Sequence, residues 1–100
     1  MNSIPHFYSF PNDSKLFNCI ANHPVLGDTS SYFTKRKVTQ AVVKAFADKK
    51  GISSSEIEPR TTAAIRESTF VRGNPNISIS LLAIMQMSFA HAVQDCAKKE

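Results

Sequence analysis

A chain of 100 residues, 42% hydrophobic and 20% charged, has the composition of one ordinary globular domain and not of a disordered chain. Its net charge of +4 is concentrated in one segment, since residues 34–50 hold six cations against Asp48 alone. The first ten residues lack the basic start and apolar stretch of a secretory signal, and no segment has the composition of a membrane span. We therefore expect one domain over residues 1–100 that lies in the cytoplasm, away from membranes.

An N-terminal arm over residues 1–12 precedes the first predicted helix. Two prolines interrupt regular structure in this arm. Its three aromatic residues can pack against the rest of the protein: Phe7, Tyr8 and Phe10. Asp13 or Ser14 can cap a short helix that follows the arm. This helix should end near Asn22, because the residue before Pro24 is pushed out of the helical region.

The second helix has the clearest boundaries in the sequence. Thr34 is a good N-cap residue, with Phe33 and Val38 placed for a hydrophobic staple around it. Apolar residues then recur at helical spacing as far as Phe46, and Gly51 follows two lysines that suit a helix C-terminus. We expect this helix to begin after Thr34 and to end before Gly51.

The basic segment coincides with the second helix. Its first three cations would lie in the first turn, where they oppose the helix dipole at a cost of roughly 1 kcal/mol together. Because rules are more often broken where function requires it, we predict a partner- or anion-binding site here. Its residues are Lys35, Arg36, Lys37, Lys44, Lys49 and Lys50. Alternatively the helix begins near Ser30 or Ser31, which moves the charges into the second turn and removes the conflict.

A third helix is predicted from Ser53 or Ser55 towards Arg72, because two overlapping capping boxes begin it. Pro59 is compatible with this helix in its first turn and disruptive deeper inside.

The junction before the third helix also matches the spacing of a helix-turn-helix motif. A small residue, a turn glycine and two apolar residues stand at the required intervals: Ala47, Gly51, Ile52 and Ile57. Against this hypothesis, the second helix of the motif would hold Pro59 and bring Glu56 and Glu58 towards DNA. A DNA-binding regulator is therefore the alternative function.

The last quarter of the chain is apolar around nearly its whole circumference if residues 77–93 are helical. Asn76 or Ser78 can cap a long fourth helix that runs to Lys98. The alternation Ile-Ser-Ile-Ser instead allows a small hairpin over residues 68–80, but an isolated hairpin is only marginally stable. We therefore favour the helix and place it at the centre of the core.

One stripe of this last helix is predicted to mediate self-association. Its residues follow each other at steps of four and three: Leu81, Met85, Phe89 and Ala92. Three short helices leave part of a central helix uncovered, and apolar strips of that kind usually mark a two-fold interface. We expect a homodimer. Alternatively, the aromatic arm folds back and closes the strip within one chain.

Two cysteines and two histidines lie near the ends of the first and last helices. Cys19 and His23 are four residues apart, and His91 and Cys96 are five apart. Four such ligands could supply a zinc tetrahedron, but a spacing of five directs the second pair away from a common face. We therefore expect no metal site, and we expect both cysteines to be reduced thiols.

These predictions describe an all-α protein, a compact bundle of about four helices with a long, apolar C-terminal helix. The sequence contains no phosphate-binding loop or nucleophile motif, so we expect neither an enzyme nor a cofactor. The expected function is that of a small binding protein, an adaptor, regulator or inhibitor, that docks on a larger macromolecule through its basic helix. The expected partner is a protein, with nucleic acid as the alternative.

Overall fold

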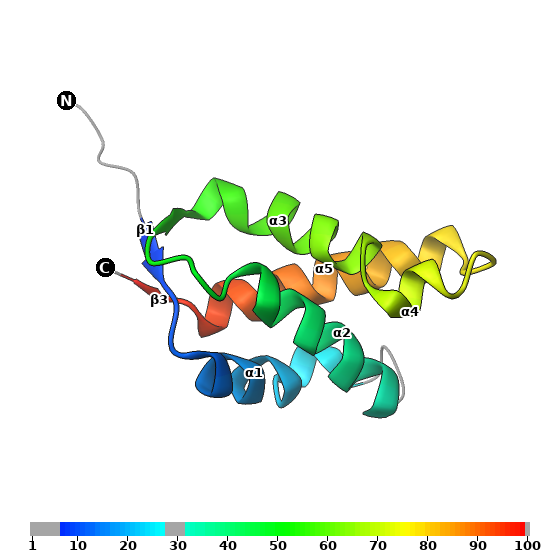
Figure 1. Ribbon diagram of the computed structural model, residues 1–100, viewed down its shortest axis with the longest axis horizontal. Helices are drawn as coiled ribbons and strands as arrows, with labels where there is room; N and C mark the ends of the chain where they lie inside the picture. The colour runs from blue at the N-terminus through cyan, green and yellow to red at the C-terminus, as the bar shows by residue number, and fades with distance from the viewer. Residues whose placement is uncertain (1–6, 28–31, 100) are drawn as a thin grey trace.

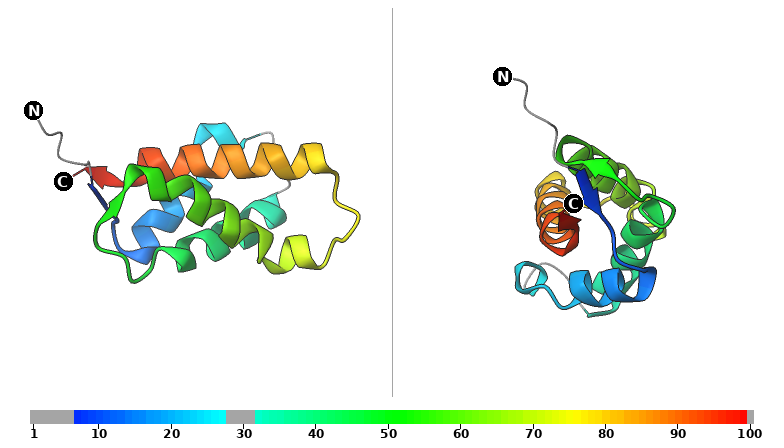
Figure 2. Two further views of the ribbon diagram at one scale, coloured as in Figure 1. Left: turned by 90° about the horizontal axis from the view of Figure 1, so that it is seen from above. Right: turned by 90° about the vertical axis from the view of Figure 1, so that its left-hand side faces the viewer.

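Helix α5 (Ile79–Cys96) runs along most of the bundle (Figures 1 and 2). The computed structural model describes residues 7–27 and 32–99. Within these residues it contains five α-helices, a short 3-10 helix and one small sheet. The helices are α1 (Asp13–Ala21), η1 (Pro24–Leu26), α2 (Tyr32–Ala45), α3 (Ser54–Arg66), α4 (Thr69–Arg72) and α5. Helices α1, η1 and α3 pack against α5, while α2 packs against α1 and α3. The predicted all-α fold is confirmed. No helix in the described residues is long and apolar enough to cross a membrane.

Helix α2 begins two residues earlier than its predicted N-cap. Its first residue is Tyr32, so Thr34 lies inside the helix and the alternative of an earlier start is confirmed. The cations at 35–37 therefore follow the first three helical residues, and their conflict with the helix dipole largely disappears. The helix ends at Ala45, where the backbone tightens into i→i−3 hydrogen bonds such as Phe46 N–H to Val43 C=O at 3.0 Å.

The predicted third helix is divided at Ser68. The Ser68 hydroxyl donates to the Ile65 carbonyl at 2.6 Å and accepts from the Val71 backbone N–H at 3.4 Å. This side chain closes α3 and caps α4, so one predicted helix becomes two. Pro59 lies inside α3, which continues beyond it to Arg66.

The N-terminus of α5 settles the choice between helix and hairpin. Residues 68–80, all of which the structure describes, form α4, a turn and the start of α5, and they contain no strand. The Ser78 side chain accepts a hydrogen bond from the Leu81 backbone N–H at 3.1 Å, which confirms Ser78 as the cap. The hairpin alternative is therefore wrong.

A small antiparallel sheet, absent from the predictions, lies at one end of the bundle (Figure 1). Strand β1 (Phe7–Ser9) pairs on one side with β2 (Ile52–Ser53) and on the other with β3 (Lys98–Lys99). Part of the predicted arm is thus a strand, and Tyr8 within it is only 9% exposed. The described part of the arm, residues 7–12, does not close the predicted stripe near Leu81. It packs at the C-terminal end of α5, while residues 1–6 lie outside the described residues.

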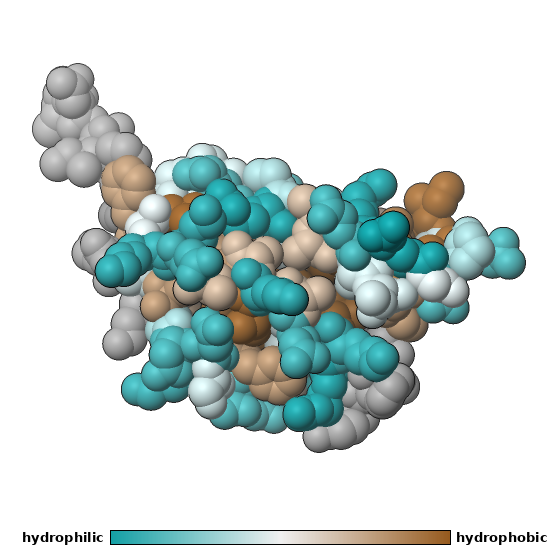
Figure 3. Space-filling model, viewed as in Figure 1, coloured by the Kyte–Doolittle hydropathy of each residue, from teal (hydrophilic) through white to brown (hydrophobic). Residues whose placement is uncertain are grey.

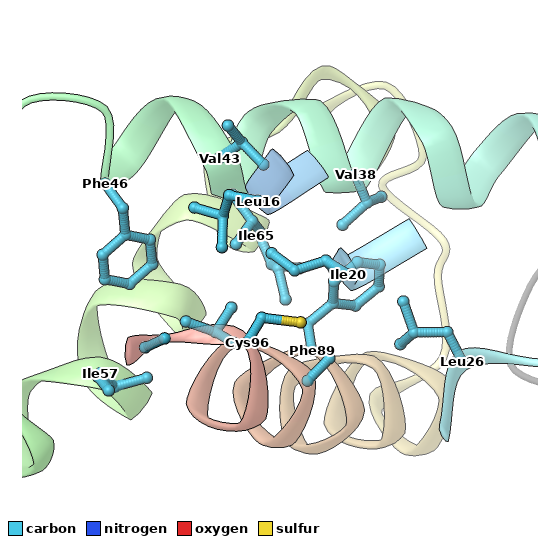
Figure 4. Close-up of a cluster of buried hydrophobic side chains, with 14 of the residues drawn as sticks. Leu16, Ile20, Leu26, Val38, Val43, Phe46, Ile57, Ile65, Phe89 and Cys96 are labelled. Carbon is cyan, nitrogen blue, oxygen red and sulfur yellow. The ribbon is translucent and has the colours of Figure 1, made fainter. Parts of the chain in front are cut away.

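The core fills the space between α5 and the surrounding helices (Figure 4). Its largest buried side chains come from every long helix and from the turn that follows α2: Leu16, Ile20, Val38, Phe46, Ile57, Ile65 and Phe89. Three residues of the predicted self-association stripe, Met85, Phe89 and Ala92, are at most 1% exposed. The predicted interface is therefore wrong for these three residues, because they face the helices of their own chain, whereas Leu81 is 37% exposed.

The prediction of two free thiols is also wrong. Cys19 in α1 forms a disulfide with Cys96 at the end of α5, across a sequence separation of 77 residues, with the two Cα atoms 5.9 Å apart. The two positions meet because α1 and α5 pack against each other. The disulfide joins a helix from the first quarter of the chain to the central helix. It closes a loop that contains α2, α3 and α4.

Candidate functional site

Two adjoining hollows that share Phe17 and Gln40 lie between α1 and α2, and together we call them the basic groove. It is lined by Phe17, Arg36, Lys37, Gln40 and Lys44, with Asp13 and Ser14 on the α1 side. Residues 36, 40 and 44 follow each other at steps of four along α2, which places them on one face of that helix. Phe17 comes from α1 and is half-buried. In Figure 3, hydrophilic side chains flank a pale-brown area over these two helices.

An aromatic ring and a guanidinium group meet in this groove. The Arg36 guanidinium lies over the Phe17 ring, 5.0 Å from its centroid, within the range of a cation–π interaction. The contact holds the Arg36 side chain against α1 while Lys37 and Lys44 remain exposed. The groove therefore offers an apolar surface bordered by three cations of α2, with the Asp13 carboxylate of α1 at its edge. This combination suits a ligand with carboxylate or phosphate groups next to an apolar group.

The remaining cations of the predicted site are placed differently. Lys49 and Lys50 line a second hollow, beyond the end of α2, together with Phe10 and Phe46. The rings of Phe10 and Phe46 stack with centroids 4.6 Å apart. Lys35 is half-buried on α2 and is not part of the basic groove. The structure thus gathers three of the six predicted cations into one groove and two into an adjacent hollow.

Two groove residues, Phe17 and Gln40, were not predicted as part of the site. Gln40 could have been found from its spacing, since it lies four residues after Arg36 and four before Lys44. Phe17 could not, because its role depends on how α1 packs against α2.

The geometry of a helix-turn-helix is not formed. Ala47 follows the last residue of α2 and so lies outside the helix in which the motif requires it. Gly51, within the described residues, does not adopt the left-handed conformation that the motif's turn needs. Ile52 is instead part of strand β2, where it is paired with Tyr8. The spacing that matches a helix-turn-helix motif therefore arises where α2 ends and strand β2 begins.

The exposed side of α5 carries an apolar strip, which we define by Ile79, Ile84 and Met87. These side chains are 86%, 49% and 70% exposed. Figure 3 shows a brown patch at the end of the molecule where α5 begins. No charged residue lies on α5 before Asp95, so the strip is uncharged as well as apolar.

The cysteine and histidine pairs of the first and last helices do come together, contrary to the geometric objection raised from their spacing. Beside the Cys19–Cys96 disulfide, His23 Nε2 lies 2.8 Å from Asp95 Oδ2. His91 Nε2 lies 3.4 Å from the same Asp95 oxygen, and the two histidine rings are 5.8 Å apart. These three residues, His23, His91 and Asp95, form a cluster. His91 and Asp95 are four residues apart on α5, and Asp95 was not among the predicted ligands.

A scan against models of known families finds no match for this chain, and searches of curated proteins and of solved structures find none either.

Proposed function

We propose that this chain is a non-enzymatic binding protein that holds an acidic segment of a larger protein in the basic groove. The observation that supports the proposal is the arrangement of Arg36, Lys37 and Lys44 around the half-buried ring of Phe17. Charges on one side of a helix and an adjacent apolar surface are what a peptide with carboxylate and apolar side chains requires. Such a partner would make the chain an adaptor, regulator or inhibitor.

The dimensions of the groove favour a peptide over duplex DNA. From residue 36 to residue 44 the helix rises roughly 12 Å, which equals about four extended residues. Duplex binding instead relies on many phosphate contacts over a broad face. Glu56 and Glu58 on α3 are exposed carboxylates, which would repel the phosphate groups of a duplex. Capture of nucleic acid in place of a protein is therefore the competing result of the following experiment.

Replacing Lys37 and Lys44 by glutamate should abolish capture of the protein partner from an extract of the native cell. Charge reversal places carboxylates opposite those of the partner, and like charges across an interface cost several kcal/mol. The matched control is Arg66→Glu with Arg72→Glu, which changes the net charge by the same amount on α3 and α4. The measurement is affinity capture followed by mass spectrometry, with and without nuclease, and circular dichroism confirms that both variants are folded.

The control variant should retain the partner, and nuclease treatment should leave the capture unchanged. Equal loss of the partner in both variants would show that net charge, and not the groove, drives binding. Loss of the partner on nuclease treatment would instead favour nucleic acid. In that case, affinity for duplex DNA should also fall steeply as salt is raised.

We also propose that the protein forms a homodimer through the apolar strip, in place of the buried stripe first predicted. Ile84 and Met87 stand exposed on the same side of α5, and Ile79 extends the surface towards its N-terminus. Because the strip carries no charge, two copies can meet across it without repulsion, although each chain has a net charge of +4.

Light scattering at micromolar concentration should give twice the monomer mass of 11.1 kDa. Met87→Arg should shift the protein to monomer without loss of helix content, since a buried unpaired cation in the interface is costly while the side chain is exposed in the monomer. A wild-type protein that is monomeric at this concentration contradicts the proposal.

A cytoplasmic location remains a prediction, and the expectation of free thiols that accompanied it is wrong. Disulfides are rare in the cytosol of most organisms, so the Cys19–Cys96 bond weighs against that location.

A further inference from the structure

We propose that His23, His91 and Asp95 form a binding site for a divalent transition-metal ion, with Zn²⁺ as the ion best suited to it. The ligand atoms of these three residues all lie within 4.8 Å of one another. Two imidazole nitrogens and one carboxylate oxygen are a donor set that Zn²⁺ accepts readily, whereas Mg²⁺ and Ca²⁺ prefer oxygen ligands.

The fold holds the three ligands from two separate elements. His91 and Asp95 are one turn apart on α5, so their side chains project from the same face of that helix. His23 lies between α1 and η1, and its side chain caps η1. The Cys19–Cys96 disulfide fixes these elements against each other, since Cys19 is four residues before His23 and Cys96 directly follows Asp95.

The distances suit coordination with only small movements. The Asp95 oxygen lies 2.8 Å from His23 Nε2 and 3.4 Å from His91 Nε2. Ligand atoms about 2.0–2.2 Å from a tetrahedral ion are separated by roughly 3.3 Å. The side chains of His91 and Asp95 are 62% and 52% exposed, so an ion can reach them from solvent. Three protein ligands leave the fourth position to water.

Binding of the ion at His23 requires the proton of the imidazole ring to move from one ring nitrogen to the other. His23 Nδ1 accepts a hydrogen bond from the Val25 backbone N–H at 3.1 Å, so the proton of the neutral ring is on Nε2 and is donated to Asp95. An ion at Nε2 displaces this proton, which returns to the ring at Nδ1, and the Val25 N–H then loses its acceptor. A hydrogen bond of this kind changes an equilibrium constant by about tenfold, so the exchange reduces the affinity without preventing binding.

The test is a Zn²⁺ titration of tag-free protein with its disulfide intact, followed by calorimetry and by the amide resonances of the protein. We expect saturable binding of one ion per chain and no comparable binding of Mg²⁺. His91→Ala and Asp95→Asn should each weaken Zn²⁺ binding by at least about tenfold, because loss of an outer-shell partner alone has an effect of that size. Neither side chain is buried, so both variants should remain folded, as circular dichroism can verify.

His6→Ala is the matched control, since His6 is the remaining histidine of the chain. It should leave the affinity unchanged, and saturation with Zn²⁺ should shift the Val25 amide resonance as its hydrogen bond is released. The proposal is overturned if Zn²⁺ does not bind at concentrations up to about 100 μM, a weak affinity by the standard of structural zinc sites. It is also overturned if His91→Ala and Asp95→Asn bind as well as wild type, or if the Val25 resonance does not move on saturation.

Discussion

Reduction of the Cys19–Cys96 disulfide should lower the free energy of unfolding by about 4 kcal/mol. The bond joins residues separated by 77 positions, and a cross-link across so long a loop removes much of the conformational freedom of the unfolded chain. For a protein of this size the loss is a large part of the total stability, and the melting temperature should fall by about 20 °C. Urea and thermal unfolding with and without a dithiol reductant measure both quantities.

The double variant Cys19→Ser with Cys96→Ser distinguishes the effect of losing the disulfide from any other effect of the reductant. Its stability should match that of reduced wild type, and the reductant should not change it further. Thiol titration after denaturation without reductant should find no free thiol in the wild-type protein. A stability that reduction changes by less than about 1 kcal/mol would contradict the loop-closure argument, since this argument predicts an effect several times larger.

Phe89→Ala should destabilise the protein by about 4 kcal/mol. The Phe89 side chain is fully buried in the core, and removing a buried phenylalanine ring costs about 3–5 kcal/mol through lost burial and the cavity left behind. Chemical denaturation measures the effect. Because Phe89 packs within its own chain, the loss should not depend on protein concentration, as it would if Phe89 belonged to a dimer interface.

Phe7→Ala is the matched control for this substitution. Phe7 is 43% exposed in strand β1, so the same change of side chain should cost about 1 kcal/mol or less. Similar losses for Phe7→Ala and Phe89→Ala would contradict the placement of Phe89 in the core.

The helices could largely be predicted from the sequence because their signals are local. The Ser78 cap, the apolar periodicity of residues 38–46 and the proline after His23 each act within a few residues of the boundary they define. The exact boundaries were less accurate, as at Thr34 and Ser68, because capping side chains compete with one another along the chain.

The orientation of α5 could not be predicted in the same way. A helix that is apolar around most of its circumference does not indicate which side its neighbours cover. Met85, Phe89 and Ala92 therefore looked like a free stripe, while Ile84 and Met87 on the opposite side are the exposed residues. The choice depends on how α1 and α3 pack against α5.

The sheet and the disulfide escaped prediction because they depend on distant residues. Two of the strands are two residues long, too short for a periodic pattern, and β1 pairs with residues far along the chain. Cys19 and Cys96 lie on helices whose contact no local signal defines. The histidine cluster was missed for the same reason. The relevant partner of His91 on α5 is Asp95, at a spacing of four, and not Cys96 at a spacing of five.

The central position of α5 has a consequence for how the chain folds during its synthesis. The apolar faces of α1 and α3 are covered by a helix that is made last among the described helices. At about 5–20 residues per second, the ribosome needs roughly 4–15 s to reach Cys96 after Cys19 has been added. During that interval the apolar side chains of α1 have no final partner on α5. Until the last quarter emerges, the early helices can bury their apolar faces only against one another, as α1 and α3 do against α2.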